Sequence, residues 1–90
     1  MARISVVRTS EATFRVEVKE GSTKTMHDVT ATPADVERYG GDVEAERLVR
    51  ASFEFLLERE PKESILGTFA LPVIERYFSE YPSEIKKYLP

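Results

Sequence analysis

The sequence contains no cysteine, and it contains only one histidine, His27. The absence of cysteine excludes disulfide bonds, thiolate nucleophiles and cysteine-based zinc or iron–sulfur sites. A transition-metal site within the chain would have to combine carboxylates with a single imidazole, and no spacing of ligands suggests one. Because no cystine can staple the fold, its stability must come from a hydrophobic core or from a partner.

Long apolar runs are also missing. No stretch approaches the roughly 20 apolar residues that a membrane-spanning helix needs. The first ten residues lack the apolar segment of a secretory signal. We therefore expect a cytoplasmic protein.

Motifs that mark enzymes are absent from the sequence as well. The four glycines form neither a G-x-G-x-x-G fingerprint nor a P-loop. The serines lie in no nucleophile-elbow context, and the many carboxylates have the spacing of solvated helix faces. His27 lies beside Asp28 in a predicted strand, where adjacent side chains take opposite faces, so we interpret it as a structural histidine. We expect no enzyme, no catalytic or metal-binding residue and no cofactor.

The charges also argue against nucleic acid as a partner. Thirteen basic residues are set against sixteen acidic ones, which gives a net charge of −3. A chain of this charge has no overall attraction for phosphate backbones, and its basic residues are scattered along the sequence.

What is present is the composition of one folded domain spanning residues 1–90, with 41% hydrophobic and 32% charged residues. The first third alternates between apolar and polar residues, most clearly at Phe14, Val16 and Val18. Short connections, one of them with Gly21 at a turn, favour an antiparallel arrangement. We predict a three-stranded meander over about 2–9, 12–20 and 23–31.

The pattern then changes to helical spacing, and we predict an α+β fold with three to four helices packed on one face of the sheet. Thr32 is a good N-cap for a short helix over about 33–39, with Pro33 at its first position. Asp42 is a second N-cap, for a helix over about 43–59 that Pro61 ends. A short helical turn follows over about 61–66, and another helix over about 71–80 that Pro82 closes. Residues 82–90 form a loose tail or a last turn.

The helix over 43–59 has an unusually wide apolar surface. At about 100° per residue, its apolar side chains cover an arc of about 200°, whereas a surface helix needs a stripe of roughly 100°. This helix must therefore be covered on two sides. The sheet is one cover, and the other is the C-terminal segment or a second subunit.

Two kinds of partner are open to a chain of this type. Tyrosine is frequent at protein contacts, so we predict a partner surface that includes Tyr39, Tyr77, Tyr81 and Tyr88; the alternative is that these rings complete the core. The free edges of the sheet offer further contacts to another protein or to a second copy. This favours a protein-interaction or regulatory module, with a homodimer as one form. The alternative is a DNA-binding regulator that uses a helix-turn-helix-like segment over 62–78.

Residues 48–85 include the run "FEFLLEREPKESIL" and, further on, "VIERYF". In these residues the chain resembles a family of small uncharacterised bacterial proteins. The resemblance implies a compact stand-alone domain and carries no known activity or site residue. The β-ribbon followed by helices is also similar, at the level of the fold, to the small antitoxins of toxin–antitoxin pairs, which implies a protein partner.

Overall fold

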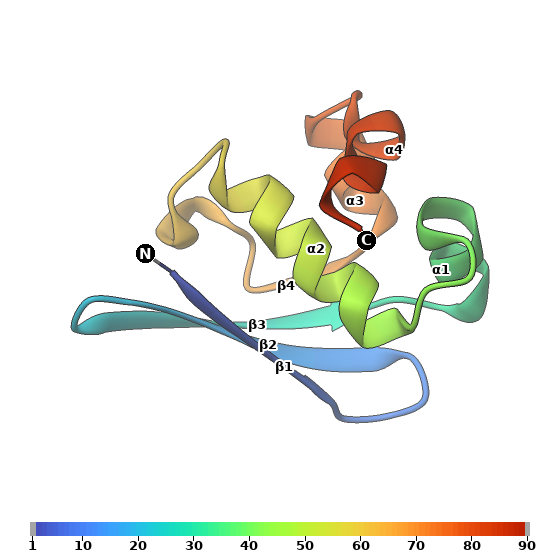
Figure 1. The fold of residues 1–90 in the computed structure, drawn as a ribbon. Helices are drawn as coiled ribbons and strands as arrows, with labels where there is room; N and C mark the ends of the chain where they lie inside the picture. Colours follow the sequence, from blue (N-terminus) through green and yellow to red (C-terminus); the bar gives the residue numbers. More distant parts are fainter. Residues whose placement is uncertain (1, 90) are drawn as a thin grey trace.

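A four-stranded β-sheet forms one layer of the protein, and the helices lie on one of its faces (Figure 1). The computed structural model describes residues 2–89. The strands are β1 (Arg3–Arg8), β2 (Thr13–Glu20), β3 (Thr23–Thr30) and β4 (Thr68–Ala70), in that spatial order. The first three are antiparallel neighbours and β4 is parallel to β3. The predicted α+β fold with its antiparallel meander is confirmed, and β4 is an addition to it.

The strand register places the apolar residues of the meander on one face. Phe14, Val16 and Val18 of β2 are fully buried, as their alternation predicts. Val16 lies between Val6 of β1 and His27 of β3. The chain reverses between β2 and β3 at Gly21, whose φ of 61° is a conformation that favours glycine.

Within residues 2–89, four α-helices and two short 3₁₀ turns complete the fold. They are α1 (Pro33–Gly40), α2 (Ala45–Leu57), the 3₁₀ turn η1 (Lys62–Ser64), α3 (Pro72–Tyr77), α4 (Tyr81–Glu84) and the 3₁₀ turn η2 (Ile85–Tyr88).

The start of α1 is the one that the sequence predicts. The hydroxyl of Thr32 accepts a hydrogen bond from the backbone amide of Asp35 at 3.1 Å. The carboxylate of Asp35 accepts one in turn from the backbone amide of Thr32, also at 3.1 Å. The prediction for α2 needs a correction, because its N-cap is Glu44 rather than Asp42 and makes no side-chain capping bond.

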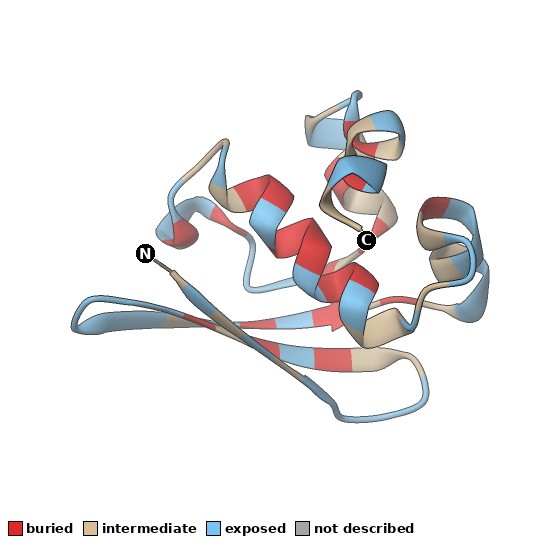
Figure 2. Cartoon of the chain, viewed as in Figure 1, coloured by how far each residue is buried: buried red, intermediate tan, exposed pale blue. Residues whose placement is uncertain are grey.

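Helix α2 is buried on two sides, as its wide apolar arc predicts. Figure 2 shows buried residues on successive turns of α2, between the sheet and the C-terminal turns. Phe53 faces the sheet, with its ring centroid 5.2 Å from His27 and 6.0 Å from Phe69. Phe55 faces the C-terminal turns, 5.3 Å from Tyr81 and 5.9 Å from Tyr88. The second cover therefore comes from the same chain, and the arc no longer requires a second subunit.

The segment after α2 departs most from the sequence predictions. The helix expected over 61–66 is only the turn η1, because Ile65 is already extended and the chain goes on to pair with β3. The helix expected over 71–80 stops at Tyr77, because Phe78 is extended and packs its ring 5.9 Å from Phe55. Residues 62–78 thus contain a 3₁₀ turn, a strand and a six-residue helix, which is not a helix-turn-helix.

The C-terminal residues are helical through Tyr88 rather than a loose tail. Pro82 stands in the first turn of α4, where the missing amide hydrogen costs nothing, so it does not close the preceding helix. Tyr81 and Ile85 are fully buried against α2 and α1. Residue 90 lies outside the described residues.

Phe53→Ala should lower the free energy of unfolding by about 3–5 kcal/mol, because the ring is fully buried between two other aromatic rings. Urea denaturation followed by circular dichroism measures the change. Val7→Ala is the control, since Val7 is 58% exposed on the open face of the sheet and its truncation should matter little. A loss below about 1 kcal/mol for Phe53→Ala would contradict this packing.

Candidate functional site

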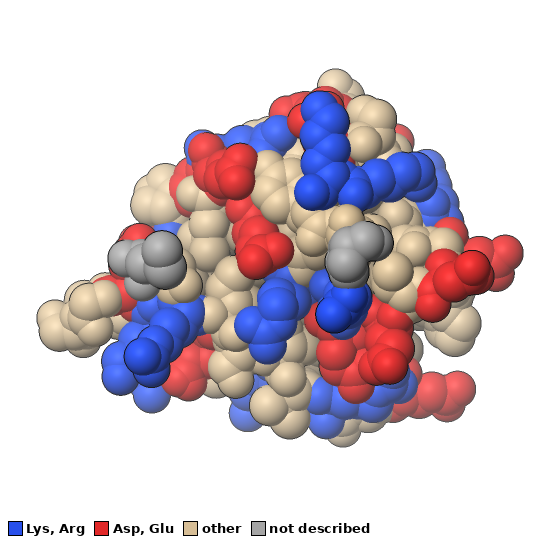
Figure 3. All heavy atoms as spheres, in the orientation of Figure 1, with Lys and Arg blue, Asp and Glu red and all other residues tan. Residues whose placement is uncertain are grey.

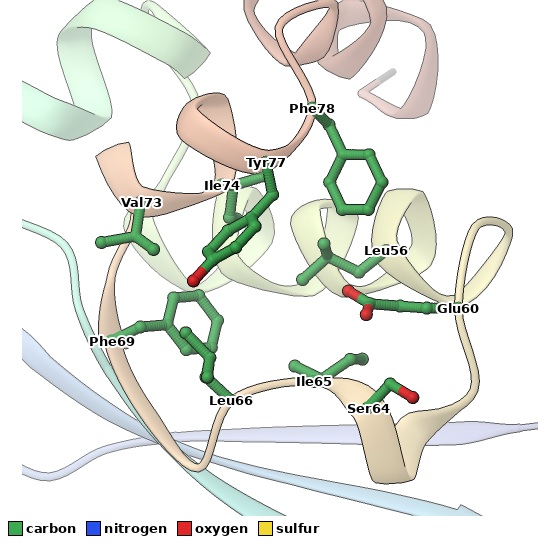
Figure 4. Close-up of a pocket in the computed structure, with 10 residues that line it drawn as sticks. All are labelled: Leu56, Glu60, Ser64, Ile65, Leu66, Phe69, Val73, Ile74, Tyr77 and Phe78. Atoms are coloured by element: carbon green, nitrogen blue, oxygen red, sulfur yellow. The ribbon is translucent and has the colours of Figure 1, made fainter.

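An apolar pocket of about 160 Å³ opens between the end of α2, the segment before β4, and α3 (Figure 4). Leu56 and Glu60 form its back wall, and Ile74 and Tyr77 of α3 form the wall opposite the chain before β4. The full lining is Leu56, Glu60, Ser64, Ile65, Leu66, Phe69, Val73, Ile74, Tyr77 and Phe78. Eight of these ten side chains are apolar or aromatic, so the pocket is suited to an apolar group.

His27 anchors the wall of the pocket that precedes β4. Its Nδ1 lies 2.7 Å from the carbonyl oxygen of Leu66, and its Nε2 lies 2.8 Å from Oγ1 of Thr25. Because a carbonyl oxygen can only accept, Nδ1 carries a hydrogen and donates it to Leu66, and Nε2 forms its hydrogen bond with the hydroxyl of Thr25. This buried ring is fully hydrogen-bonded, which agrees with its interpretation as a structural histidine, and it holds Leu66 at the pocket rim.

Lys62 is a second polar anchor for the same wall. Its side chain is buried, and Nζ donates to Oγ1 of Thr23 at 2.7 Å and to Oε2 of Glu63 at 2.6 Å. Glu20 adds a carboxylate at 3.8 Å, so the ammonium is compensated by two acidic groups. The contacts with Glu20 and Thr23 tie η1 to the turn between β2 and β3.

The opposite wall is held by contacts from α1. Glu75 of α3 accepts from the hydroxyl of Tyr39 at 2.9 Å and from Arg38 at 3.1 Å. Burial, together with this carboxylate, raises the pKa of Tyr39 to about 12, so the hydroxyl remains a donor at neutral pH. Both walls of the pocket are therefore fixed by side chains that lie outside it.

The end of α2, which forms the back of the pocket, is fixed by Arg59. The guanidinium lies 3.6 Å from the ring centroid of Phe55 and donates to Oε2 of Glu80 at 3.1 Å. It also donates to the carbonyl of Phe55 at 3.0 Å and lies 3.4 Å from the hydroxyl of Tyr88. This cation–π contact and ion pair join α2 to the C-terminal turns.

Glu60 is the only acidic residue in the lining of this pocket. Partial burial against apolar side chains raises the pKa of its carboxyl group above the ordinary glutamate value. Across residues 2–89, no lysine or arginine forms an ion pair with it. A cationic group bound at the pocket would offset the cost of desolvating this carboxylate.

The four tyrosines predicted to form a partner surface do not form one exposed surface. Tyr39 and Tyr81 are fully buried and pack on each other with centroids 4.9 Å apart, so their assignment to a surface is wrong. Tyr88 is half-buried, and its hydroxyl donates to Glu58 at 2.6 Å. Only Tyr77, at 68% exposed, is fully open to solvent, and it lines the pocket.

Sequence reasoning missed the other residues of the pocket. Leu66 is 46% exposed although it is apolar, and it precedes Gly67 in a segment that was expected to be a helical turn. No role was predicted for Glu60, which follows the helix predicted over 43–59. Its neighbours in the sequence are mostly charged, in the run "EREPKE" over 58–63, so no local pattern points to a desolvated carboxylate.

Other surfaces of the described residues are weaker candidates for a functional site. A wider hollow near the start of α1 has mixed polar walls, and Arg8 at its edge is paired with Glu46 at 3.4 Å. Figure 3 shows basic and acidic side chains interspersed over the face in view. Within residues 2–89 no group of three or more metal-ligating side chains is placed to hold an ion. None of the described helices combines the length and the apolar character needed to cross a membrane.

Comparison with protein-family models, with curated proteins and with solved structures gives no match to this chain. The resemblance of residues 48–85 to small bacterial proteins therefore stays a prediction. Any functional argument rests on the pocket itself.

Glu60→Gln should stabilise the protein at neutral pH. Because the folded-state pKa of Glu60 is raised above its unfolded value, the native state binds more protons and loses stability as the pH rises between those two values. The neutral side-chain amide of the glutamine variant removes this pH-dependent loss of stability. The gain in Tm should be present at pH 7 and should disappear below pH of about 4, where the carboxyl group is protonated in both states.

Thermal unfolding at several pH values measures this difference. Glu54→Gln is the matched control, because Glu54 is exposed on α2, the helix that precedes Glu60, and its charge is solvated. A Glu60→Gln variant that is less stable than the natural chain at pH 7 would show that the carboxylate has a stabilising partner.

Proposed function

We propose that this chain is a small cytosolic protein-interaction module without catalytic activity, and that it binds one apolar side chain of a partner protein in the pocket of Leu56, Phe69 and Tyr77. The main support for this function is the size of the pocket together with its composition. Pockets for cofactors and drug-sized ligands hold about 300–1,000 Å³. A volume of about 160 Å³ matches a single ring or branched side chain, as apolar cavities of that size take benzene.

The charge at the pocket specifies a second feature of the partner. Glu60 contributes a carboxylate without a paired cation to a largely apolar lining. A lysine or arginine next to the apolar anchor would pair with it in a partly desolvated place, where such a pair discriminates between partners. The proposed partner therefore carries an apolar residue and a basic residue close together.

Exposed apolar groups at the pocket also favour a protein partner. Tyr77 and Leu66 are large, and they are 68% and 46% exposed at its rim. Protein contacts characteristically have such a side-chain pocket with aromatic residues around it. The interaction class agrees with the resemblance to antitoxins, which bind a protein partner.

Selection from a phage-displayed library of linear peptides against the immobilised full-length chain tests this function. We expect enriched peptides to share an apolar residue with a lysine or arginine one or two positions away. A synthetic peptide from the selection should bind the natural chain and bind Val73→Trp at least tenfold more weakly, because the indole fills the pocket. Val7→Trp places the same indole on the distant sheet face and is the control. Failure to enrich any peptide, or equal binding by Val73→Trp, would refute the proposal.

The role of Glu60 is tested with a double-mutant cycle. Replacing the basic residue of the selected peptide by glutamine should weaken its binding to the natural chain by about five- to tenfold, the range of a partly desolvated ion pair. The same replacement should change binding to Glu60→Gln by less than about twofold. Isothermal titration calorimetry gives the four affinities. Equal losses of affinity for the natural chain and for Glu60→Gln would show that Glu60 takes no part in recognising the peptide.

A further inference from the structure

The outer edge of β4 lies beside the pocket and has the backbone groups of a strand that is paired on one side only. β4 is the last strand of the sheet. The amide of Asp28 donates to the carbonyl of Gly67, and the amide of Leu71 donates to the carbonyl of Thr30. In a parallel ladder alternate residues point to the same neighbour, so Gly67, Phe69 and Leu71 face β3.

The backbone groups of Thr68 and Ala70 consequently point away from β3. Thr68 is exposed and Ala70 is half-buried. Between them, Phe69 sends its side chain into the pocket (Figure 4). The free edge of β4 and the pocket thus lie next to each other: Thr68 and Ala70 supply the outward backbone groups, and Phe69 between them supplies part of the apolar wall.

We infer that the partner segment binds in an extended conformation, adding a strand to the free edge of β4 and placing its apolar anchor in the pocket beside Phe69. This inference rests on the proposed function and specifies its geometry. Neighbouring strands lie about 4.8 Å apart, so a strand added beside β4 runs along the pocket rim. Because strand side chains alternate, the anchor residue faces the pocket while its two neighbours face the other side, so the basic residue that pairs with Glu60 lies two positions from the anchor.

The occupant is a segment of another protein rather than a second copy of this chain. The chain's own edge strand β1 does contain an exposed apolar residue next to a basic one, Val7 and Arg8. However, Arg8 is already engaged with Glu46 at 3.4 Å and with the carbonyl of Glu11 at 2.8 Å. Addition of β1 to β4 of another copy would also be a head-to-tail contact, which builds open chains rather than a closed dimer.

Backbone amide exchange tests the geometry with the full-length chain and the peptide obtained by phage selection. When the chain is saturated with the peptide, the backbone amide hydrogens of Thr68 and Ala70 should exchange at least tenfold more slowly than in the free protein. NMR measures these exchange rates. The amide of Leu71 is the internal control, since it is already bonded to Thr30 and should change little.

An N-methyl scan of the same peptide gives an independent readout. Methylation should weaken binding at least tenfold at alternate peptide residues, whose amides face β4, and by less than twofold at the residues between them. Thr68→Pro, which removes one outward amide, should weaken binding, whereas Thr68→Ala, which keeps it, should not. Thermal unfolding checks that both variants are folded.

The possible outcomes distinguish a failure of the strand-addition geometry from a failure of the proposed function. If the peptide binds and Val73→Trp blocks it, but Thr68 and Ala70 exchange unchanged and the N-methyl scan shows no alternation, the strand addition is overturned and the proposed function stands. If no peptide is selected, the proposed function itself fails. Open-chain assembly of the protein alone, seen by light scattering and lost on Arg8→Gln, would assign the β4 edge to a second copy and overturn the inference.

Discussion

The burial of α2 between two layers is the constraint on which the rest of the structure depends. Phe53 and Phe55 are two residues apart and so point to nearly opposite sides of the helix. One ring packs on the sheet beside His27 and Phe69, and the other packs on the C-terminal turns beside Tyr81. A chain without cysteine gains its stability from this sandwich, because both faces of α2 remove aromatic surface from water.

The sandwich also explains why a pocket exists. After α2 the chain must return to the sheet to form β4 and must then reach the other side of α2 with α4 and η2. His27 and Lys62 hold the first part of this path against β3, and Glu75 and Phe78 hold the second part against α1 and α2. The two parts are anchored apart from each other, which leaves the apolar space between them open.

Local patterns were sufficient to predict much of the fold. The alternation at Phe14, Val16 and Val18 and the capping box of Thr32 depend on near neighbours in the chain. The predictions that failed depend on distant residues. β4 has only three residues, too few for an alternation to be recognised, and its hydrogen bonds come from β3, which lies some forty residues earlier. Tyr77 was predicted to be a contact residue, but the other residues of the pocket were not, because the pocket is built from three separate segments.

By itself the sequence determined that strands precede helices, where α1 begins, and that α2 needs a cover on each side. These follow from periodicity and capping, in which each residue acts on neighbours within a few positions. The tertiary structure alone decided that the chain supplies both covers, that Tyr39 and Tyr81 are core residues, and that Glu60 lies in an apolar lining. The physical reason is that burial is a relation between surfaces, and the surfaces that meet here belong to segments far apart along the chain.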